Sequence, residues 1–199
     1  MINQVDRYVL IAHMSEPVSG NEERYLALSG DRKAEFGSRY SIEVVPYHWN
    51  DRKKFNRDCA LVQSYYERYL AKLVPRLNYY HDTAYSERYW RIIIGPWLYP
   101  TIALLFDRWT MIDKALLEFP VDFIEIASHD LKEVVEIDFI SISDNDSKYN
   151  EAIYAAILNY RGGVKLRSIE VLDSKVISKQ PAYNLKKRAL AAINRLLGR

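Results

Sequence analysis

Arg88 and Arg91 begin the densest group of side chains that could bind a charged ligand. They are three residues apart, so on a helix both project from one face. Two guanidinium groups at a helix start can hold a carboxylate or a phosphate through paired hydrogen bonds, and the helix dipole adds to the attraction. The structural alternative is an ion pair between Arg91 and Glu87, one helical turn apart. Tyr89 and Trp90, in the same stretch, are further candidate substrate-binding residues.

A second candidate group follows the apolar run at residues 42–45. His48 lies in the loop after this predicted strand, and ligands of open α/β sheets bind beyond the carboxyl ends of strands. Because its ordinary pKa is near neutrality, His48 is the candidate catalytic base, or a donor that orients the substrate. Trp49 offers a stacking face, and the alternative is a capping loop around a buried histidine. His13 and Ser15 occupy the corresponding place after the first predicted strand.

Other chemical patterns are weaker or missing. Asp107 and Arg108 place an acid beside a base in a helical pattern, and we interpret this pair as structural. The sequence has no Walker loop, no nucleophile elbow and no zincin motif, and no set of His, Cys or carboxylate residues has convincing metal spacing. We therefore expect no metal and no tightly bound cofactor.

Strand-like and helix-like patterns alternate along the chain, which predicts an α/β layer fold with a mainly parallel sheet. Among the strands, 8–12, 42–45 and 121–126 are expected to be neighbours. Residues 134–142 fit either a strand or an irregular turn of helix. The predicted strands are 8–12, 24–28, 42–45, 121–126 and 164–172.

Two long helical patterns occupy the middle of the chain. The first is capped by Asn50 or Asp51 and is expected to kink or break near Pro75. The second follows a cap at Ser86 and is expected to be interrupted at the Gly-Pro pair 95–96. Two further helices are expected, one between a cap at 144–147 and the glycines at 162–163, and one over 183–197.

Composition and charge narrow the protein class. The chain has 199 residues, of which 49% are hydrophobic and 27% charged, which is typical of one globular domain or one and a half. The net charge of +2 does not indicate nucleic-acid binding. A basic stretch at 183–199 fits an anionic ligand or a membrane surface, or simply a solvated helix face. The single Cys59 fits a reducing compartment.

The longest stretch without a charged residue is 92–106. A membrane-spanning helix needs about 20 residues, and this shorter run contains two prolines. We expect it to be buried inside the protein. The sequence therefore predicts a cytoplasmic protein, with peripheral contact at the inner face of the cytoplasmic membrane as an alternative.

Four segments together resemble the N-terminal part of a family of bacterial transferases for surface carbohydrate biosynthesis. The resemblance covers roughly residues 5–160, and members of that family are substantially longer. After the second strand the family often has a Gly-Glu-Trp-Cys-like element, whereas this chain has Ser-Gly-Asp-Arg at 29–32. The segments that carry the resemblance are Pro46–Arg52, Ser86–Trp97, Phe106–Trp109 and Tyr149–Tyr154.

The resemblance implies a GT-B-like glycosyltransferase of cell-surface polysaccharide biosynthesis, of which this chain is a fragment that is inactive alone. Residues 1–163 would form a Rossmann-like, acceptor-side domain with long kinked helices, and 164–199 would begin a further, truncated βα segment. The expected partners are a sugar acceptor and a nucleotide sugar donor, the donor being bound by the full-length protein. The alternative is a non-catalytic α/β module that binds carbohydrate or a partner protein.

The residue patterns and the family resemblance together give the candidate site residues. His48 is the candidate catalytic residue. The resemblance adds Asn150 to the substrate-binding candidates. Those candidates are Arg88, Arg91, Trp49, Glu87, Tyr89, Trp90 and Asn150.

Overall fold

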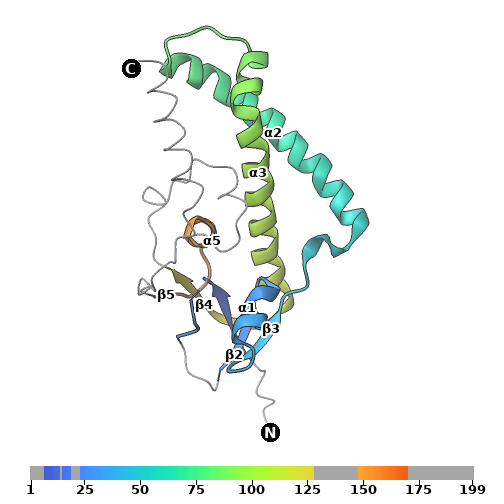
Figure 1. Ribbon diagram of the computed structural model, residues 1–199, viewed down its shortest axis with the longest axis vertical. Coiled ribbons are helices and arrows are strands. Elements are labelled where there is room, and N and C mark those ends of the chain that lie inside the picture. Colours follow the sequence, from blue (N-terminus) through green and yellow to red (C-terminus); the bar gives the residue numbers. More distant parts are fainter. Residues whose placement is uncertain (1–6, 14, 19–22, 128–147, 170–199) are drawn as a thin grey trace, which may run out of the picture.

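A single parallel sheet of five strands forms the base of the molecule, and the computed structural model describes residues 7–13, 15–18, 23–127 and 148–169 (Figure 1). Its strand order is β3-β2-β1-β4-β5. The strands are β1 (Tyr8–Ala12), β2 (Arg24–Ala27), β3 (Ser41–Val44), β4 (Val121–Ala127) and β5 (Leu166–Ile169). The helices are α1 (Gly30–Phe36), the 3-10 turn η1 (His48–Asn50), α2 (Arg52–Tyr80), α3 (Glu87–Glu118) and α5 (Lys148–Arg161).

The predicted α/β class is confirmed, and the layered fold is Rossmann-like. Every strand pair is parallel, and the order is that of the first five strands of a Rossmann-type sheet. The expectation that β1, β3 and β4 are neighbours is wrong for β3, because β2 lies between β3 and β1. β2 is buried along Tyr25–Ala27, as an interior strand must be, whereas β3 alternates exposed and buried residues, which suits an edge.

Helices cover both faces of the sheet. On one face, Phe36 of α1 packs on Ile11 and Tyr25 within a small apolar cluster. On the other face, the C-terminal half of α3 packs with α5 on β1 and β4, and Ile112 and Leu158 are fully buried there. Burial on both faces explains why β1 is a continuous apolar run rather than an alternating pattern.

The helices α2 and α3 form a hairpin that projects from the sheet (Figure 1). Their starts are capped as the sequence predicts. The side chain of Asp51 accepts hydrogen bonds from the backbone of the first turn of α2, and that of Ser86 does the same in α3. The two helices share an apolar cluster that includes Tyr66, Leu70 and Trp90.

The expected interruption of α3 is wrong, because this helix continues through Pro96. α2 continues through Pro75 and does not break there, and a kink at Pro75 stays a prediction. A proline inside a helix costs about 3 kcal/mol, and packing over such long helices offsets that cost. Gly95 has a different role from the predicted break. A Cβ atom at this position would lie 2.7 Å from the Tyr66 hydroxyl, so glycine permits the close approach of α2 and α3.

The uncharged run 92–106 lies within α3, and it is only partly buried. Leu98 and Ile102 face α2, whereas Ile92, Ile93 and Trp97 are exposed, so the expectation that the run is buried is wrong for these three. Both sides of the helix are apolar, and α2 covers only one of them. Within the part of the chain that the structure describes, no helix is long and apolar enough to cross a membrane.

Several sequence expectations fall outside the described residues. They are the element at 134–142, the cap at 144–147 and the helix at 183–197. Within the predicted strand at 164–172, Leu166–Ile169 form β5, which pairs with β4, and residues 170–172 lie outside the described residues. This part of the C-terminal segment therefore shares one sheet with β1–β4.

The packing of α3 on the sheet predicts that substitutions at two positions of that helix change the free energy of unfolding by different amounts. Ile112 is fully buried, so Ile112→Ala should lower the free energy of unfolding by about 2–5 kcal/mol. Leu117 is 82% exposed, and Leu117→Ala should change it by less than about 0.5 kcal/mol. Urea unfolding of the two variants measures both values. Equal effects would contradict the described packing of α3.

Candidate functional site

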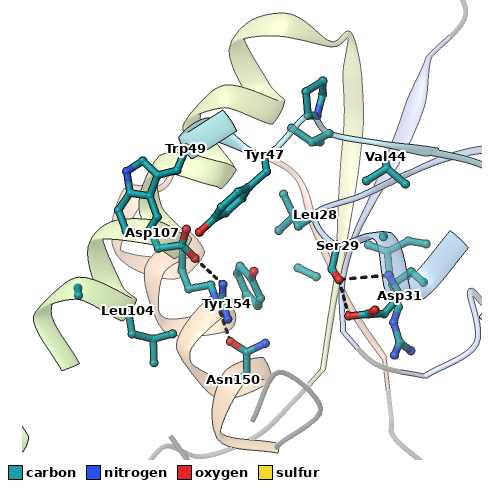
Figure 2. Close-up of a pocket in the computed structure, with 18 of the residues that line it drawn as sticks. Leu28, Ser29, Asp31, Val44, Tyr47, Trp49, Leu104, Asp107, Asn150 and Tyr154 are labelled. Carbon is teal, nitrogen blue, oxygen red and sulfur yellow. Dashed lines mark hydrogen bonds and ion pairs between the residues drawn. The ribbon is translucent and has the colours of Figure 1, made fainter. Parts of the chain in front are cut away.

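A cavity of about 930 Å³ opens at the carboxyl ends of β1, β2 and β3 (Figure 2). The loops that follow these parallel strands meet at one edge of the sheet, and α3 and α5 close the remaining sides. Aromatic and polar side chains share its wall, as in most small-molecule sites. Among the lining residues are His13, Ser29, Asp31, Tyr47, Trp49, Tyr99, Leu104, Asp107, Arg108, Asn150 and Tyr154.

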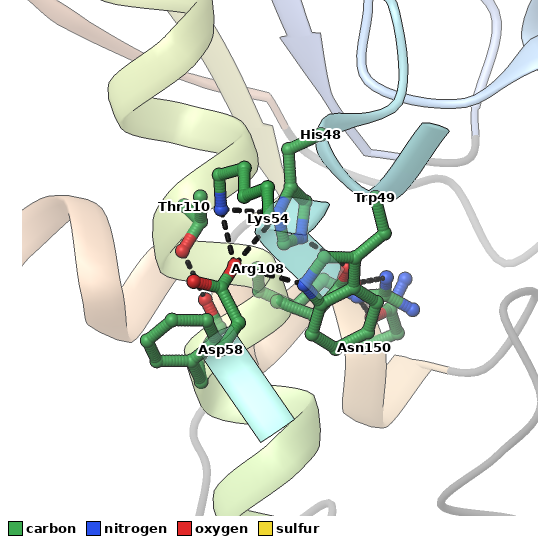
Figure 3. A network of polar contacts seen from close by, with 9 residues as sticks. His48, Trp49, Lys54, Asp58, Arg108, Thr110 and Asn150 are labelled. Carbon is green, nitrogen blue, oxygen red and sulfur yellow. Dashed lines mark hydrogen bonds and ion pairs between the residues drawn. The ribbon is translucent and has the colours of Figure 1, made fainter. Parts of the chain in front are cut away.

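The carboxylate of Asp107 is the polar centre of the cavity wall. It is only 5% exposed. Its Oδ1 lies 2.9 Å from His48 Nε2, and its Oδ2 accepts a hydrogen bond from Arg108 (Figure 3). The Tyr47 hydroxyl also hydrogen-bonds to it. Burial and the nearby charge of Asp107 raise the pKa of Tyr47, so this hydroxyl keeps its proton and remains a donor.

Arg108 links Asp107 to helix α5. Its Nε donates to Asn150 Oδ1 at 2.8 Å, and its guanidinium lies over the Tyr154 ring, 5.6 Å from the centroid. Burial raises the pKa of Tyr154 to about 12, so its hydroxyl is protonated at neutral pH. Asp107, Asn150 and Tyr154 therefore present fixed hydrogen-bonding groups to one cavity.

His48 is buried behind this wall and does not line the cavity. A carboxylate only accepts hydrogen bonds, so His48 Nε2 carries the proton that it shares with Asp107. Its Nδ1 lies 3.1 Å from Lys54 Nζ, and Lys54 in turn pairs with Asp58. Trp49 Nε1 donates to the same Asp58 carboxylate at 2.9 Å. Both nitrogens of His48 are thus engaged, and its geometry is that of a residue that positions Asp107.

The arginine group lies elsewhere. Arg91 makes paired hydrogen bonds to Glu67, at 2.8 and 2.6 Å, and a third to Glu87 at 2.8 Å. These carboxylates raise the pKa of Arg91 above its usual value. Arg91 precedes Asp107 on α3 by sixteen residues, about 24 Å along the helix. The expectation that both arginines share a concave surface with His48 is therefore wrong, and the alternative of an Arg91–Glu87 ion pair is confirmed.

The other candidates of that stretch share its position at the hairpin end. Arg88, Glu87 and Tyr89 are exposed there. Trp90 is buried, and its Nε1 donates to Asn78 Oδ1 at 2.8 Å. The three exposed residues therefore belong to the surface at the hairpin end and do not line the cavity.

Of the predicted site residues, the cavity wall includes Trp49 and Asn150. Sequence reasoning assigned Asp107 and Arg108 a purely structural role, although both line the cavity, and it did not single out Tyr47. The sequence did contain one indication that these two residues belong to a site, because a charged pair within a long apolar helix has to be buried or to meet a ligand.

His13 gives the cavity a second polar group, directly after β1. The side chain is buried, and its Nε2 lies 3.3 Å from Glu125 Oε2 in β4. Arg167 of β5 also approaches Glu125, at 3.7 Å. Within the described residues, Nδ1 of His13 has no hydrogen-bond partner. The carboxylate holds the proton on Nε2, and the Nδ1 lone pair is buried without a hydrogen-bond partner among the described residues.

The start of α1 supplies the wall between β2 and β3. Ser29 caps this helix by accepting from the backbone nitrogen of Asp31 at 3.3 Å, and its hydroxyl donates to the Asp31 carboxylate at 2.8 Å. Among the described residues, no three His, Cys, Asp or Glu side chains gather as metal ligands.

The strand order defines a Rossmann-like α/β domain, and the cavity lies at the carboxyl edge of the sheet, where ligands of such domains usually bind. The chain belongs to a transferase family: residues 22–199 match the family described as LIC12162 family transferase. Searches among curated proteins and among solved structures each found no match.

Burial of His48 predicts a pH dependence of stability. Burial is the largest single influence on the pKa of His48 and lowers it; Asp107 and Asp58 raise this pKa, Lys54 lowers it, and the net shift is downward. The unfolded chain then binds the proton more tightly, so stability is complete above an unfolded pKa of about 6.5 and falls as the pH drops below it. His48→Gln keeps a donor for Asp107 and removes this titration.

Urea unfolding between about pH 7 and pH 5 tests this assignment. The free energy of unfolding should fall less steeply in His48→Gln than in the parent protein. His81→Gln, at an exposed histidine, is the control and should keep the parent slope. Identical slopes for the parent and His48→Gln would contradict the burial argument.

Proposed function

We propose that this chain is the N-terminal, acceptor-side domain of a GT-B-like glycosyltransferase of bacterial surface carbohydrate biosynthesis. The family supports transfer chemistry, and the resemblance noted from the sequence supports sugar as the transferred group. A nucleotide sugar would be the donor, and the reaction would take place in the cytoplasm. The observation that carries the proposal is the composition of the cavity wall.

A sugar ring has apolar faces and a rim of hydroxyl groups. The cavity offers both complements, since aromatic rings such as Tyr47, Trp49 and Tyr99 lie beside the fixed polar atoms of Asp107 and Asn150. Its volume of about 930 Å³ is sufficient for a small oligosaccharide. Asp107 accepts hydrogen bonds from His48, Arg108 and Tyr47, and because a carboxylate has about four lone-pair sites it can also accept one from a sugar hydroxyl.

His13 is the better placed of the two candidate bases. Both nitrogens of His48 are engaged by Asp107 and Lys54, whereas His13 Nδ1 is buried but has no hydrogen-bond partner among the described residues. In the proposed step, acceptor binding uncovers His13 Nδ1, the acceptor hydroxyl gives its proton to this nitrogen, and its oxygen attacks the anomeric carbon of the donor. The bond from that carbon to the nucleoside diphosphate breaks, and the diphosphate leaves with the electron pair. Glu125 stabilises the imidazolium that forms.

Sugar binding by this chain tests the proposed site. Ligand-observed NMR with a panel of monosaccharides and disaccharides should detect saturation transfer to at least one sugar. Asp107→Asn should weaken that binding at least tenfold, because the substitution removes the charge that holds Arg108 and Tyr47. Asp113→Asn lies on the same helix, breaks the Arg161 ion pair outside the cavity, and should bind normally. The absence of any bound sugar would contradict the proposal.

Turnover tests the role of His13. In the complete protein that contains this chain, His13→Gln should lower the rate of sugar transfer from nucleotide sugars by about a hundredfold or more. Sugar binding should stay within about threefold of the parent value, since the polar wall around Asp107 is intact. Unchanged transfer by His13→Gln would exclude His13 as the base. Binding of a sugar without transfer from any donor would favour the non-catalytic carbohydrate-binding module.

A further inference from the structure

The outer face of α3 carries an exposed apolar strip, formed by Tyr89, Ile92, Ile93, Pro96 and Trp97. Their spacing alternates between three residues and one, which places them on one side of a helix. Ile92 is 65% exposed, Ile93 56% and Trp97 45%. α2 covers the opposite side of α3, so the outer strip makes no contribution to the shared core of the hairpin.

The same helix face leads into the cavity. Continuing the spacing from Trp97 gives Pro100, Ala103, Leu104 and Asp107, all of which line the cavity. From residue 92 to residue 104 the helix rises about 18 Å. One uninterrupted apolar surface therefore connects the hairpin end, which lies away from the sheet in Figure 1, with the wall of the candidate site.

An unpaired positive charge borders the outer strip. Arg88 lies one turn before Ile92 on the same helix face and is exposed. In the part of the chain that the structure describes, Arg88 has no ion pair. The nearby acids Glu67 and Glu87 are already paired with Arg91.

We propose that the outer strip docks the protein on an anionic lipid bilayer, with the cavity opening beside the lipid head groups. Tyr, Trp and Ile are the side chains that insert at a membrane interface, and neighbouring cations add attraction to anionic lipids. A protein partner could also cover apolar residues, but the exposed rings of Tyr89 and Trp97 beside the unpaired cation Arg88 favour a membrane interface with anionic head groups. This interfacial contact needs no spanning helix, and it does not depend on which group the protein transfers.

Vesicle binding by the full 199-residue chain tests the proposal. The chain should co-sediment with vesicles of phosphatidylcholine and phosphatidylglycerol more strongly than with phosphatidylcholine alone, and salt should weaken the binding. The double substitution Ile92→Glu and Ile93→Glu should lower the partition constant at least tenfold. Leu117→Glu with Tyr160→Glu is the matched control, since both are exposed apolar residues outside the strip, and it should bind like the parent chain.

Trp97 provides a second measurement that needs no charged variant. Vesicles with brominated acyl chains should quench part of the tryptophan emission of the parent chain, and Trp97→Phe should lose that quenched part. Three results would overturn the proposal: no binding to anionic vesicles, equal binding by the strip variant and its control, or no quenching that depends on Trp97. Self-association that competes with vesicle binding and is lost in Ile92→Glu with Ile93→Glu would assign the strip to a second copy of the chain instead.

Discussion

The buried carboxylate of Asp107 holds the three parts of this molecule together. It lies on α3, it accepts from His48 in the turn after β3, and through Arg108 it is linked to Asn150 on α5. A buried charge is tolerated only when donors surround it, and here the donors come from separate elements. The carboxylate therefore fixes where the helical hairpin stands relative to the sheet. It also builds one wall of the cavity, so the stability of this junction and the shape of the site have the same cause.

The hairpin of α2 and α3 is the main addition to a simple parallel sheet. It fills the connection between β3 and β4, and only the C-terminal half of α3 covers the sheet. The N-terminal half packs on α2 alone, which leaves an apolar side uncovered. The prolines in these helices are compatible with this arrangement, because a long helix with extensive packing on one side tolerates local losses of backbone hydrogen bonds. The molecule thus combines a binding cavity with an extended surface that starts at the cavity wall.

The candidate site shows where reasoning from sequence is strong and where it fails. The position of His48 after a strand correctly indicated the edge of the sheet that carries the cavity, and Trp49 lies in its wall. His48 itself is turned away, because its two nitrogens meet Asp107 and Lys54. Arg91 had two interpretations with similar sequence support, and the decisive partner, Glu67, is on another helix. Spacing along one helix describes neighbours on that helix only, so it could not anticipate a contact between helices.

The sequence by itself determined the local elements. A continuous apolar run specified β1 and an alternating pattern specified β4, and the side chains of Asp51 and Ser86 specified the starts of the two long helices, because these are interactions between residues close in the chain. Only the tertiary structure decided that Asp107, Tyr47 and Asn150 meet at one cavity, and that His13 reaches Glu125 across 112 positions. Such contacts depend on strand order and on how helices pack on the sheet, which many residues set jointly and no single motif encodes.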